Sequence, residues 1–267
     1  MKVAGDPILE ADQLTQRFNG RSGSSVVAFQ DVSLDIARRE FVSVIGPSGC
    51  GKSSLLRLIA GLSRPASGVV KVEGQTVSRP GADRGMVFQE YALLPWKTTL
   101  NNVGFGLSLK GLPRHEVESK ARYFMDLVGL SGSEDKYPHQ LSGGMRQRAA
   151  VARALANNPK ILLMDEPFAA VDAMTRRKLQ EDLAALTASE GTTVLFVTHS
   201  IEEAIFLSDR IVVLFGSPSR LVEELRIDFP RPRTWSEIVS HPTFVQYQEK
   251  LTELIHGQRG TPTEHST

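Results

Sequence analysis

The residues from Gly46 to Ser53 form a glycine-rich loop with the sequence GPSGCGKS. The loop satisfies the pattern G-x-x-x-x-G-K-[ST], follows an apolar run and precedes the helix-patterned segment SLLRLIAGL. Glycines let backbone N–H groups face a chain of phosphates, and a helix N-terminus favours negative charge. Lys52 is expected to bind the β- and γ-phosphates of a nucleotide, and the Ser53 hydroxyl to ligate Mg²⁺. The loop therefore predicts a nucleoside triphosphate site.

Two adjacent carboxylates follow the apolar run ILLM in the segment ILLMDEP. Successive residues near a strand end point in different directions, so Asp165 and Glu166 can have different tasks. We expect Asp165 to hold Mg²⁺, directly or through water, and Glu166 to orient and polarise an attacking water. The alternative is a capped strand end followed by a solvated loop, which the nearby phosphate loop disfavours.

A serine and two glycines stand before a helical pattern in LSGGMRQR, residues 141–148. Ser142 can act as the N-cap of that helix while further N–H groups stay free, which would make a second anion site. Composition alone favours the simpler interpretation of an ordinary capped helix.

In this order and spacing, GPSGCGKS, LSGGMRQR and ILLMDEP resemble the nucleotide-binding subunits of ABC transporters. The resemblance spans about residues 14–215, and LSGG is its specific part, because other P-loop ATPases lack it. It implies an ATPase that works as a homodimer, with ATP and Mg²⁺ as cofactors. Two subunits would sandwich two ATP molecules head to tail, so that Ser142, Gly143 and Gly144 of one chain cap the γ-phosphate bound by the other.

The resemblance also implies roles for four residues outside these motifs. Gln89 matches the glutamine that contacts Mg²⁺ and reports nucleotide state, and His199 matches the histidine that touches the γ-phosphate. Asp172 matches the aspartate of the D-loop, although Val171 replaces the usual leucine before it. Phe18 stands where an aromatic ring, more often tyrosine, stacks on adenine. Without the resemblance, a histidine after a strand is usually structural, Gln89 would by default be a surface residue, and Phe18 could as easily be a core residue.

Together these interpretations give three sets of predicted site residues. The predicted catalytic residues are Lys52, Gln89, Glu166 and His199, and the predicted Mg²⁺ ligands are Ser53, Gln89 and Asp165. The predicted nucleotide-binding residues are Gly46, Pro47, Ser48, Gly49, Cys50, Gly51, Lys52, Ser53, Ser54, Phe18, Ser142, Gly143, Gly144 and Asp172. Because Cys50 stands beside a helix N-terminus, we also expect its thiolate form to be favoured.

Several further stretches resemble one importer group of this family, that of nitrate, sulfonate and taurine uptake. They are QEYALLPWKTTLNNV, MDEPFAAVDAMTR, VTHSIEEAIFLSDRIVVL and the tail IDFPRPR. The apolar cluster from Leu93 to Trp96 follows shortly after Gln89. In the family, the surface at this place forms a groove that receives a short helix of the membrane subunit. Subdomain core is the alternative for those side chains. The sequence does not choose among nitrate, sulfonates, taurine, pyrimidine precursors and aromatic acids.

The predicted site residues must be positioned by the elements around them. Short apolar runs rich in β-branched residues occur at 41–45, 86–88, 161–164, 193–198 and 211–215. Such runs indicate parallel strands covered on both faces, and helical patterns between them predict a doubly wound α/β fold. The alternating segment 26–36 predicts additional antiparallel strands at the N-terminal side. With the resemblance, this becomes a P-loop NTPase core.

Helical patterns dominate residues 90–158, with helices expected over 114–130 and 145–158, the second closed by Pro159. We therefore predict a P-loop ATPase core of residues 1–89 and 159–215, an inserted helical signature subdomain of residues 90–158, and a tail of residues 216–267. The tail is expected to contain one helix, over 236–255, and to fray over its last ten residues.

Composition bounds the function. The 267 residues carry 31 basic and 30 acidic side chains, so a net charge of +1 gives no reason to expect nucleic acid as a partner. Cys50 cannot form an internal disulfide, which fits the cytosol. The N-terminus has no signal-peptide pattern, and no apolar run approaches the roughly 20 residues that span a bilayer. We expect a location at the cytoplasmic face of the membrane, through permease subunits and, beyond them, a solute-binding protein.

A non-transport ABC ATPase is the competing class. The DNA-repair and chromosome-structure members insert long coiled coils, and this chain has no sustained heptads. Translation factors of the family usually carry two cassettes, whereas this chain has one phosphate loop. A nucleotide kinase is a third interpretation, which LSGG disfavours. Transport is the prediction.

Overall fold

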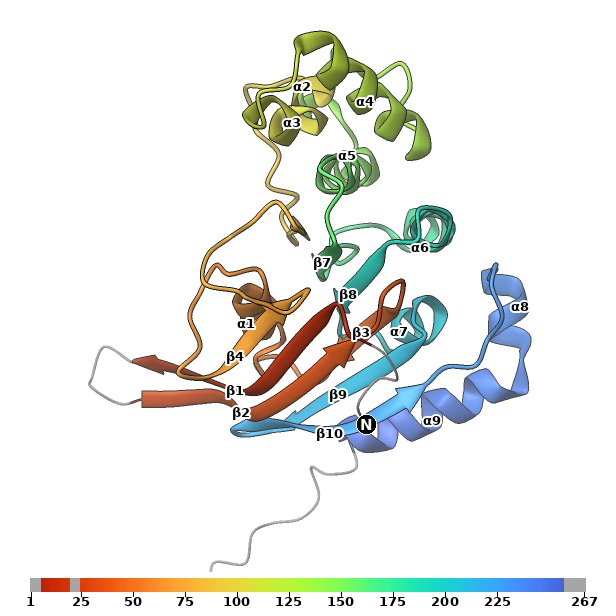
Figure 1. The fold of residues 1–267 in the computed structure, drawn as a ribbon. Coiled ribbons are helices and arrows are strands. Elements are labelled where there is room, and N and C mark those ends of the chain that lie inside the picture. Colours follow the sequence, from red (N-terminus) through yellow and green to blue (C-terminus); the bar gives the residue numbers. More distant parts are fainter. Residues whose placement is uncertain (1–5, 20–24, 257–267) are drawn as a thin grey trace, which may run out of the picture.

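A computed structural model describes residues 6–19 and 25–256 of the chain (Figure 1). The expected fraying of the last ten residues lies outside this described part. The centre of the fold is a run of five parallel strands in the order β9-β3-β8-β7-β6. Their bounds are β3 (Phe41–Ile45), β6 (Arg84–Val87), β7 (Ile161–Asp165), β8 (Thr193–Val197) and β9 (Arg210–Gly216). Every residue of β3, β7 and β8 is buried, as the continuous apolar runs predict.

Five further strands extend this sheet beyond β9 in the order β5-β4-β1-β2-β10, with antiparallel pairing except between β10 and β2, which pair parallel at Ser219 and Phe29. They are β1 (Leu9–Asn19), β2 (Ser25–Ile36), β4 (Ser67–Val72), β5 (Gln75–Thr76) and β10 (Ser219–Arg226). β1 pairs with β2 and β4, and β10 pairs with β9, all antiparallel. The predicted α/β class with N-terminal antiparallel strands is therefore confirmed. β10 was not predicted, because its alternation is broken by the adjacent charged residues Glu223 and Glu224.

Two apolar clusters occupy the two faces of the sheet. Val42 and Val44 of β3 belong to the cluster under helix α1 (Lys52–Ile59). Phe41 and Ile45 point to the other cluster, which includes residues of α6 (Ala173–Ser189) and α7 (Ile201–Leu207). The period of two along a strand produces this division.

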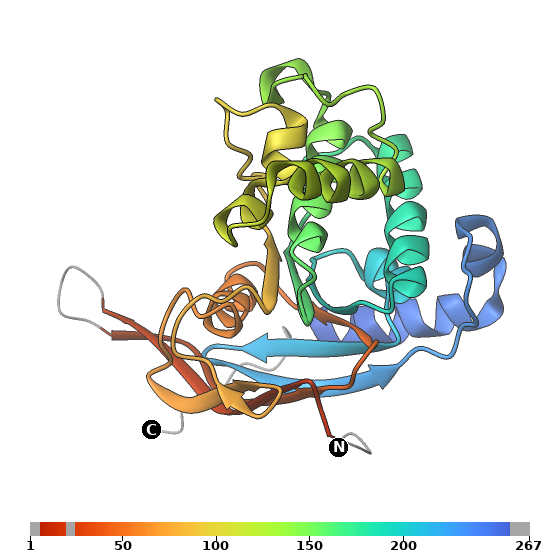
Figure 2. The same cartoon turned by 45° about the horizontal axis from the view of Figure 1, so that its top comes forward.

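A group of helices stands above the sheet, between β6 and β7 in the sequence (Figures 1 and 2). They are α2 (Thr99–Val103), α3 (Phe105–Leu109), α4 (Arg114–Leu127), the short 3₁₀ helix η1 (Pro138–Gln140) and α5 (Gly143–Ala156). α4 ends three residues earlier than predicted, because Gly129 adopts a φ of 67°. α5 begins two residues earlier than predicted, directly after its N-cap Ser142.

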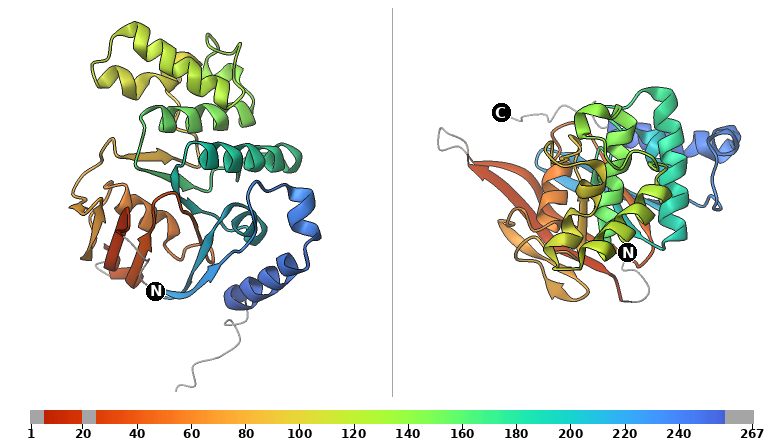
Figure 3. Two further views of the ribbon diagram at one scale, coloured as in Figure 1. Left: turned by 45° about the vertical axis from the view of Figure 1, so that its right-hand side comes forward. Right: turned by 90° about the horizontal axis from the view of Figure 1, so that it is seen from above.

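The tail runs back along α7 and β9 and contains two helices, α8 (Trp235–Ser240) and α9 (Pro242–His256) (Figure 3). The prediction of a single tail helix was wrong. His241 is extended, with φ −78° and ψ 129°, because a residue before proline disfavours the helical region. None of the helices within the described ranges is long and apolar enough to cross a membrane.

Candidate active site

The glycine-rich loop joins the end of β3 at Ile45 to the start of α1 at Lys52. A Cβ atom at Gly46 would lie 2.2 Å from the carbonyl oxygen of Leu214. At Gly51, where φ is 92°, it would lie 2.8 Å from a ring carbon of Phe29. Both positions therefore require glycine, and they hold the loop tightly against the sheet.

Lys52 is buried within this loop, with 5% of its surface exposed. Its Nζ donates hydrogen bonds to the carbonyl oxygens of Gly46 (2.8 Å) and Pro47 (3.0 Å). An ammonium group has three donors and no acceptor, so two carbonyls satisfy it only in part. The loop thus holds a cation where a phosphate chain would lie along the N-terminus of α1.

Ser53 and Asp165 meet at the carboxyl end of the parallel strands. The Ser53 hydroxyl donates a hydrogen bond of 2.8 Å to Oδ1 of Asp165, across 112 positions of the sequence. Burial raises the pKa of the Asp165 carboxyl, and the hydrogen bond from Ser53 opposes that effect. Two of the three residues predicted to hold Mg²⁺ are therefore neighbours.

Glu166 and His199 form a second pair beside the first. His199 Nδ1 lies 2.9 Å from Oε2 of Glu166. The pair is close because β7 and β8 are adjacent and Asp165 is in register with Val197. Glu166 adopts a φ of 43°, and its backbone N–H donates to the Val197 carbonyl at 2.9 Å. His199 is exposed whereas Glu166 is half-buried, so the pair opens to the surface.

Gln89 and Phe18 are two further predicted site residues, and within the described part of the chain no hydrogen bond or ion pair joins their side chains to the two pairs. Gln89 is exposed in the turn after β6, whose Val87 is in register with Met164 of β7. Phe18 lies on β1, opposite Val26, with 49% of its surface exposed. An exposed ring on this strand is available for stacking, and it is not the core residue of the alternative interpretation.

The signature segment is held apart from the phosphate loop. Ser142 Oγ accepts a hydrogen bond from Met145 N at 3.3 Å and so caps α5, as predicted. A Cβ at Gly144 would lie 3.0 Å from Cγ2 of Thr175, at the start of α6. Within the described residues, no hydrogen bond or ion pair joins residues 142–144 to Lys52 or the carboxylates of β7. α5 lies in the helical group in Figure 1, away from α1.

Asp172 is the N-cap of α6. Its carboxylate accepts a hydrogen bond of 3.0 Å from Thr175 N, and this bond lowers the pKa of Asp172. The structure therefore brings Asp172 and Gly144 to the same end of α6, through Thr175.

The apolar cluster at residues 93–96 is held by a residue that the sequence interpretation missed. Asn102 is fully buried and donates to the carbonyl oxygens of Leu94, Lys97 and Thr98. It also accepts from Leu94 N at 2.8 Å. Trp96 is left 70% exposed. The signal available in the sequence was an asparagine inside a short helix, a residue that commonly bonds local backbone.

Cys50 does not have the environment predicted for it. The side chain is buried in the apolar cluster beneath α1, and burial raises the pKa of its thiol. Lys52 Nζ, at 3.9 Å from Sγ, opposes this effect but does not outweigh it. The expectation of a favoured thiolate was wrong, because desolvation dominates over the helix N-terminus.

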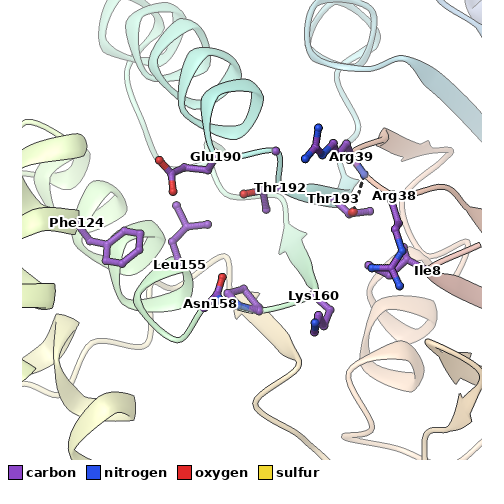
Figure 4. Close-up of a pocket in the computed structure, with 12 residues that line it drawn as sticks. Ile8, Arg38, Arg39, Phe124, Leu155, Asn158, Lys160, Glu190, Thr192 and Thr193 are labelled. Carbon is purple, nitrogen blue, oxygen red and sulfur yellow. Dashed lines mark hydrogen bonds between the residues drawn. The ribbon is translucent and has the colours of Figure 1, made fainter. Parts of the chain in front are cut away.

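A separate depression of about 290 Å³ lies at the amino ends of β7 and β8, the edge of the sheet opposite the phosphate loop (Figure 4). Arg38, Arg39 and Lys160 line one side of it and Glu190 another. Arg38 and Lys160 both pair with Glu73, at 2.7 and 3.7 Å. One carboxylate thus pairs with two of these three cations. Because no predicted site residue lines the depression, the candidate active site is the phosphate-loop edge.

Comparison with known proteins places these observations in a family. The family profile described as ABC transporter matches residues 29–169. An uncharacterised ABC transporter ATP-binding protein of Methanocaldococcus jannaschii is 51% identical over 92% of this chain and 91% of its own length. The nitrate import ATP-binding protein NrtD of Synechocystis is 45% identical, covering 96% and 98%. The taurine import ATP-binding protein TauB of Rhizobium johnstonii is 43% identical, covering 93% and 97%.

Among solved structures, the fold is similar to an ATP-binding cassette captured as a dimer in a post-hydrolysis state with ADP and phosphate. The TM-score is 0.73 at 33% sequence identity, over 83% of this chain and 100% of the other.

Proposed function

Because this chain belongs to the ABC transporter family of ATP-binding proteins, we propose that it hydrolyses ATP to drive import of a small solute such as nitrate or taurine. The observation that carries the proposal is the meeting of two pairs at one edge of the sheet. Ser53 contacts Asp165 at 2.8 Å, and Glu166 contacts His199 at 2.9 Å. This edge therefore holds the cation Lys52, the metal ligands Ser53 and Asp165, and the general base Glu166 with its partner His199.

The residues present fit a magnesium ion bound with ATP. Among the residues described, no cluster of three His, Cys, Asp or Glu side chains could form a protein-only metal site. Mg²⁺ does not need one, because it is usually held by one or two carboxylates, water and substrate phosphates. Asp165 and Ser53 would hold it, with Gln89 as a further ligand. When bound, the ion neutralises charge on the phosphate oxygens.

Hydrolysis then uses this chain's own groups in a definite order. Lys52 leaves the carbonyls of Gly46 and Pro47 and binds the β- and γ-phosphates, aided by the backbone N–H groups of Gly46 and of residues 48–54. Glu166 orients a water for in-line attack on the γ-phosphorus and accepts its proton, and the bond from the γ-phosphorus to the β,γ-bridging oxygen breaks as ADP leaves. His199 fixes the Glu166 carboxylate and contacts the γ-phosphate. Phe18 stacks on adenine.

We further propose that the working unit is a homodimer. Residues 142–144 lie apart from the phosphate loop, so a second chain is needed to bring a signature segment to each ATP. The similar cassette solved as a dimer supports this arrangement. In this proposal the helical subdomain, residues 90–158, carries the signature towards the partner's core of residues 1–89 and 159–215, and Asp172 lies between them.

The same proposal gives the chain a membrane partner. Trp96 is 70% exposed on a segment whose backbone Asn102 fixes, which makes a firm apolar surface for a helix of the permease. The chain would then sit at the cytoplasmic face of the membrane, bound through the permease. A solute-binding protein would deliver the solute from the other side.

Reconstitution tests this function. Vesicles containing the permease that co-purifies with this chain are loaded with MgATP and this ATPase, and the matching binding protein is added outside with labelled nitrate, taurine, an alkylsulfonate or bicarbonate. We expect uptake of one of these anions to depend on ATP and to disappear with Lys52→Ala. ATP hydrolysis without uptake of any solute, or with no co-purifying permease, would favour a non-transport ABC ATPase.

A further inference from the structure

Glu203 is a buried carboxylate on α7, with 5% of its surface exposed. Its two oxygens accept hydrogen bonds from two different elements. Oε2 accepts a short bond from the Thr198 hydroxyl, and Oε1 accepts from Gln180 Nε2 of α6 at 2.7 Å. Both partners are themselves buried, with 2% exposed. Burying a carboxyl group among the apolar clusters around α6 and α7 is costly unless its oxygens are hydrogen-bonded, and both oxygens of Glu203 are.

Thr198 connects this carboxylate to the candidate active site. The Thr198 hydroxyl donates to Glu203 and also accepts from the backbone N–H of Ser200 at 3.0 Å. Ser200 Oγ in turn caps α7 by accepting from Glu203 N at 3.3 Å. The residue between Thr198 and Ser200 is His199. Its backbone is therefore fixed on both sides by bonds that converge on Glu203.

Gln180 carries the same network into α6. That helix begins directly after Asp172, and Arg176, its fourth residue, donates to the Val171 carbonyl at 2.7 Å. Gln180 Oε1 has no hydrogen-bond partner within the described part of the chain. One buried carboxylate thus joins the interior of α6, at Gln180, to the segment that precedes α7. Burial raises the pKa of Glu203, with Arg176 and His199 opposing the effect alongside the two hydrogen bonds.

We propose that Glu203 is a positioning residue for ATP hydrolysis, which holds His199 through Thr198 at the distance where it contacts Glu166. The inference rests on the roles proposed above for His199 and Glu166. A displacement of about 1 Å at such a pair can cost on the order of 100-fold in rate, so a residue outside the reacting atoms can have a large effect. The link to Gln180 makes that position depend on α6 as well.

Three single variants distinguish the effect of the Glu203 hydrogen bonds on the rate from the effect of its charge. Glu203→Ala should lower kcat by about tenfold or more, with KM for MgATP and nucleotide binding changed less than about twofold. Glu203→Gln should restore most of the rate, because Gln180 can turn its amide and offer its unpartnered Oε1 to the new N–H group. Glu202→Ala, at the exposed neighbour on the same helix, is the matched control and should leave kcat unchanged.

A double-mutant cycle with His199→Ala tests whether Glu203 acts through His199. In the His199→Ala background, Glu203→Ala should cost less than about twofold in kcat, because the group it positions is gone. If the two losses multiply, or if Glu203→Ala raises KM as much as it lowers kcat, the positioning role is wrong. Should Glu203→Ala fail to fold, Thr198→Val replaces it in the cycle, since it keeps the shape and removes the hydroxyl. A His199→Ala variant that hydrolyses normally would instead refute the proposed catalytic site, and the inference with it.

Discussion

At the scale of single residues, the carboxylates at the end of β7 divide the work by environment. Asp165 is buried and accepts a hydrogen bond from the Ser53 hydroxyl. A bound metal ion would take the place of that hydrogen between the two oxygens. Glu166 is half-buried, has a φ of 43° and faces His199. A non-glycine residue in that region of φ is uncommon and often marks a functional site. The backbone therefore turns Glu166 out of the strand direction towards the surface where a water can enter.

This division gives the first prediction. Glu166→Gln keeps the shape of the side chain but removes the group that polarises water, while Lys52, Ser53 and Asp165 remain. MgATP binding should stay within about threefold of wild type, and the hydrolysis rate should fall by about 100-fold or more. Nucleotide binding is followed by fluorescence of a labelled ATP and hydrolysis by phosphate release. A rate within a few-fold of wild type would remove Glu166 from catalysis.

Single residues also show what sequence alone could predict. The types and spacing of Lys52, Asp165 and Glu166 were enough to place them together, because carboxyl ends of parallel strands meet at one edge. The environment of Cys50 was not predictable in this way. Its thiol could have faced the phosphates or the core, and only packing beneath α1 decides that it faces the core. Asn102 and Glu203 were missed because their partners are distant or on the backbone.

At the scale of elements, the tail packs against the C-terminal end of α7 and stabilises it. The buried guanidinium of Arg233 donates to the carbonyls of Phe206 and Ser208 at the C-terminal end of that helix. Desolvation lowers the pKa of Arg233 to about 10, with a smaller contribution from the nearby Arg231. The Trp235 ring stacks on Phe206 with centroids 4.3 Å apart. The family-like segment IDFPRPR thus has a structural task, which its turn-prone pattern did not reveal.

Removing the Trp235 ring should weaken the contact between the tail and α7. Trp235→Ala deletes a side chain with 8% of its surface exposed, and its loss should lower the free energy of unfolding by roughly 3–5 kcal/mol. Val239→Ala is the matched control on α8, because Val239 is 44% exposed. Urea unfolding measures both. Equal stability of the two variants would show that the tail does not support α7.

The exposed segment after β6 gives a prediction about assembly. Trp96→Glu places a charge on a residue that is 70% exposed, so the chain should fold and bind ATP as before. Co-purification with the permease should be lost, because a buried unpaired charge at the centre of an interface costs several kcal/mol. Leu109→Glu, on α3 and 71% exposed, is the control in the same group of helices. An intact complex with Trp96→Glu would place the docking surface elsewhere.

At the scale of the whole molecule, the arrangement of the two anion-binding motifs decides the mechanism. The sequence predicted both motifs and the α/β core, because each depends on a local pattern. The distance between the motifs depends on how the helical group stands on the sheet, and no local pattern contains that. In the structure, Ser142 caps α5 away from Lys52, while Gly144 packs on Thr175 beside Asp172. One chain alone does not bring a signature to its own phosphate loop.

The central claim is therefore that each active site is shared between two chains, and mixing mutants tests it. Lys52→Ala removes a phosphate cation, and Ser142→Arg blocks the signature N–H groups sterically. In a head-to-tail dimer of one chain of each kind, one site has both defects and the other has none. A Glu166→Gln background should keep the dimer closed on ATP. In that background the site without defects can be detected because it traps nucleotide.

The measurement is the amount of MgATP trapped per dimer, with association followed by size-exclusion chromatography. We expect either variant alone to trap none and the mixture to trap about one ATP per mixed dimer, because one intact site is restored. If Ser142→Arg alone traps as much ATP as its parent, or if mixing adds nothing to the separate variants, the sites are not shared and the proposed dimer mechanism is wrong.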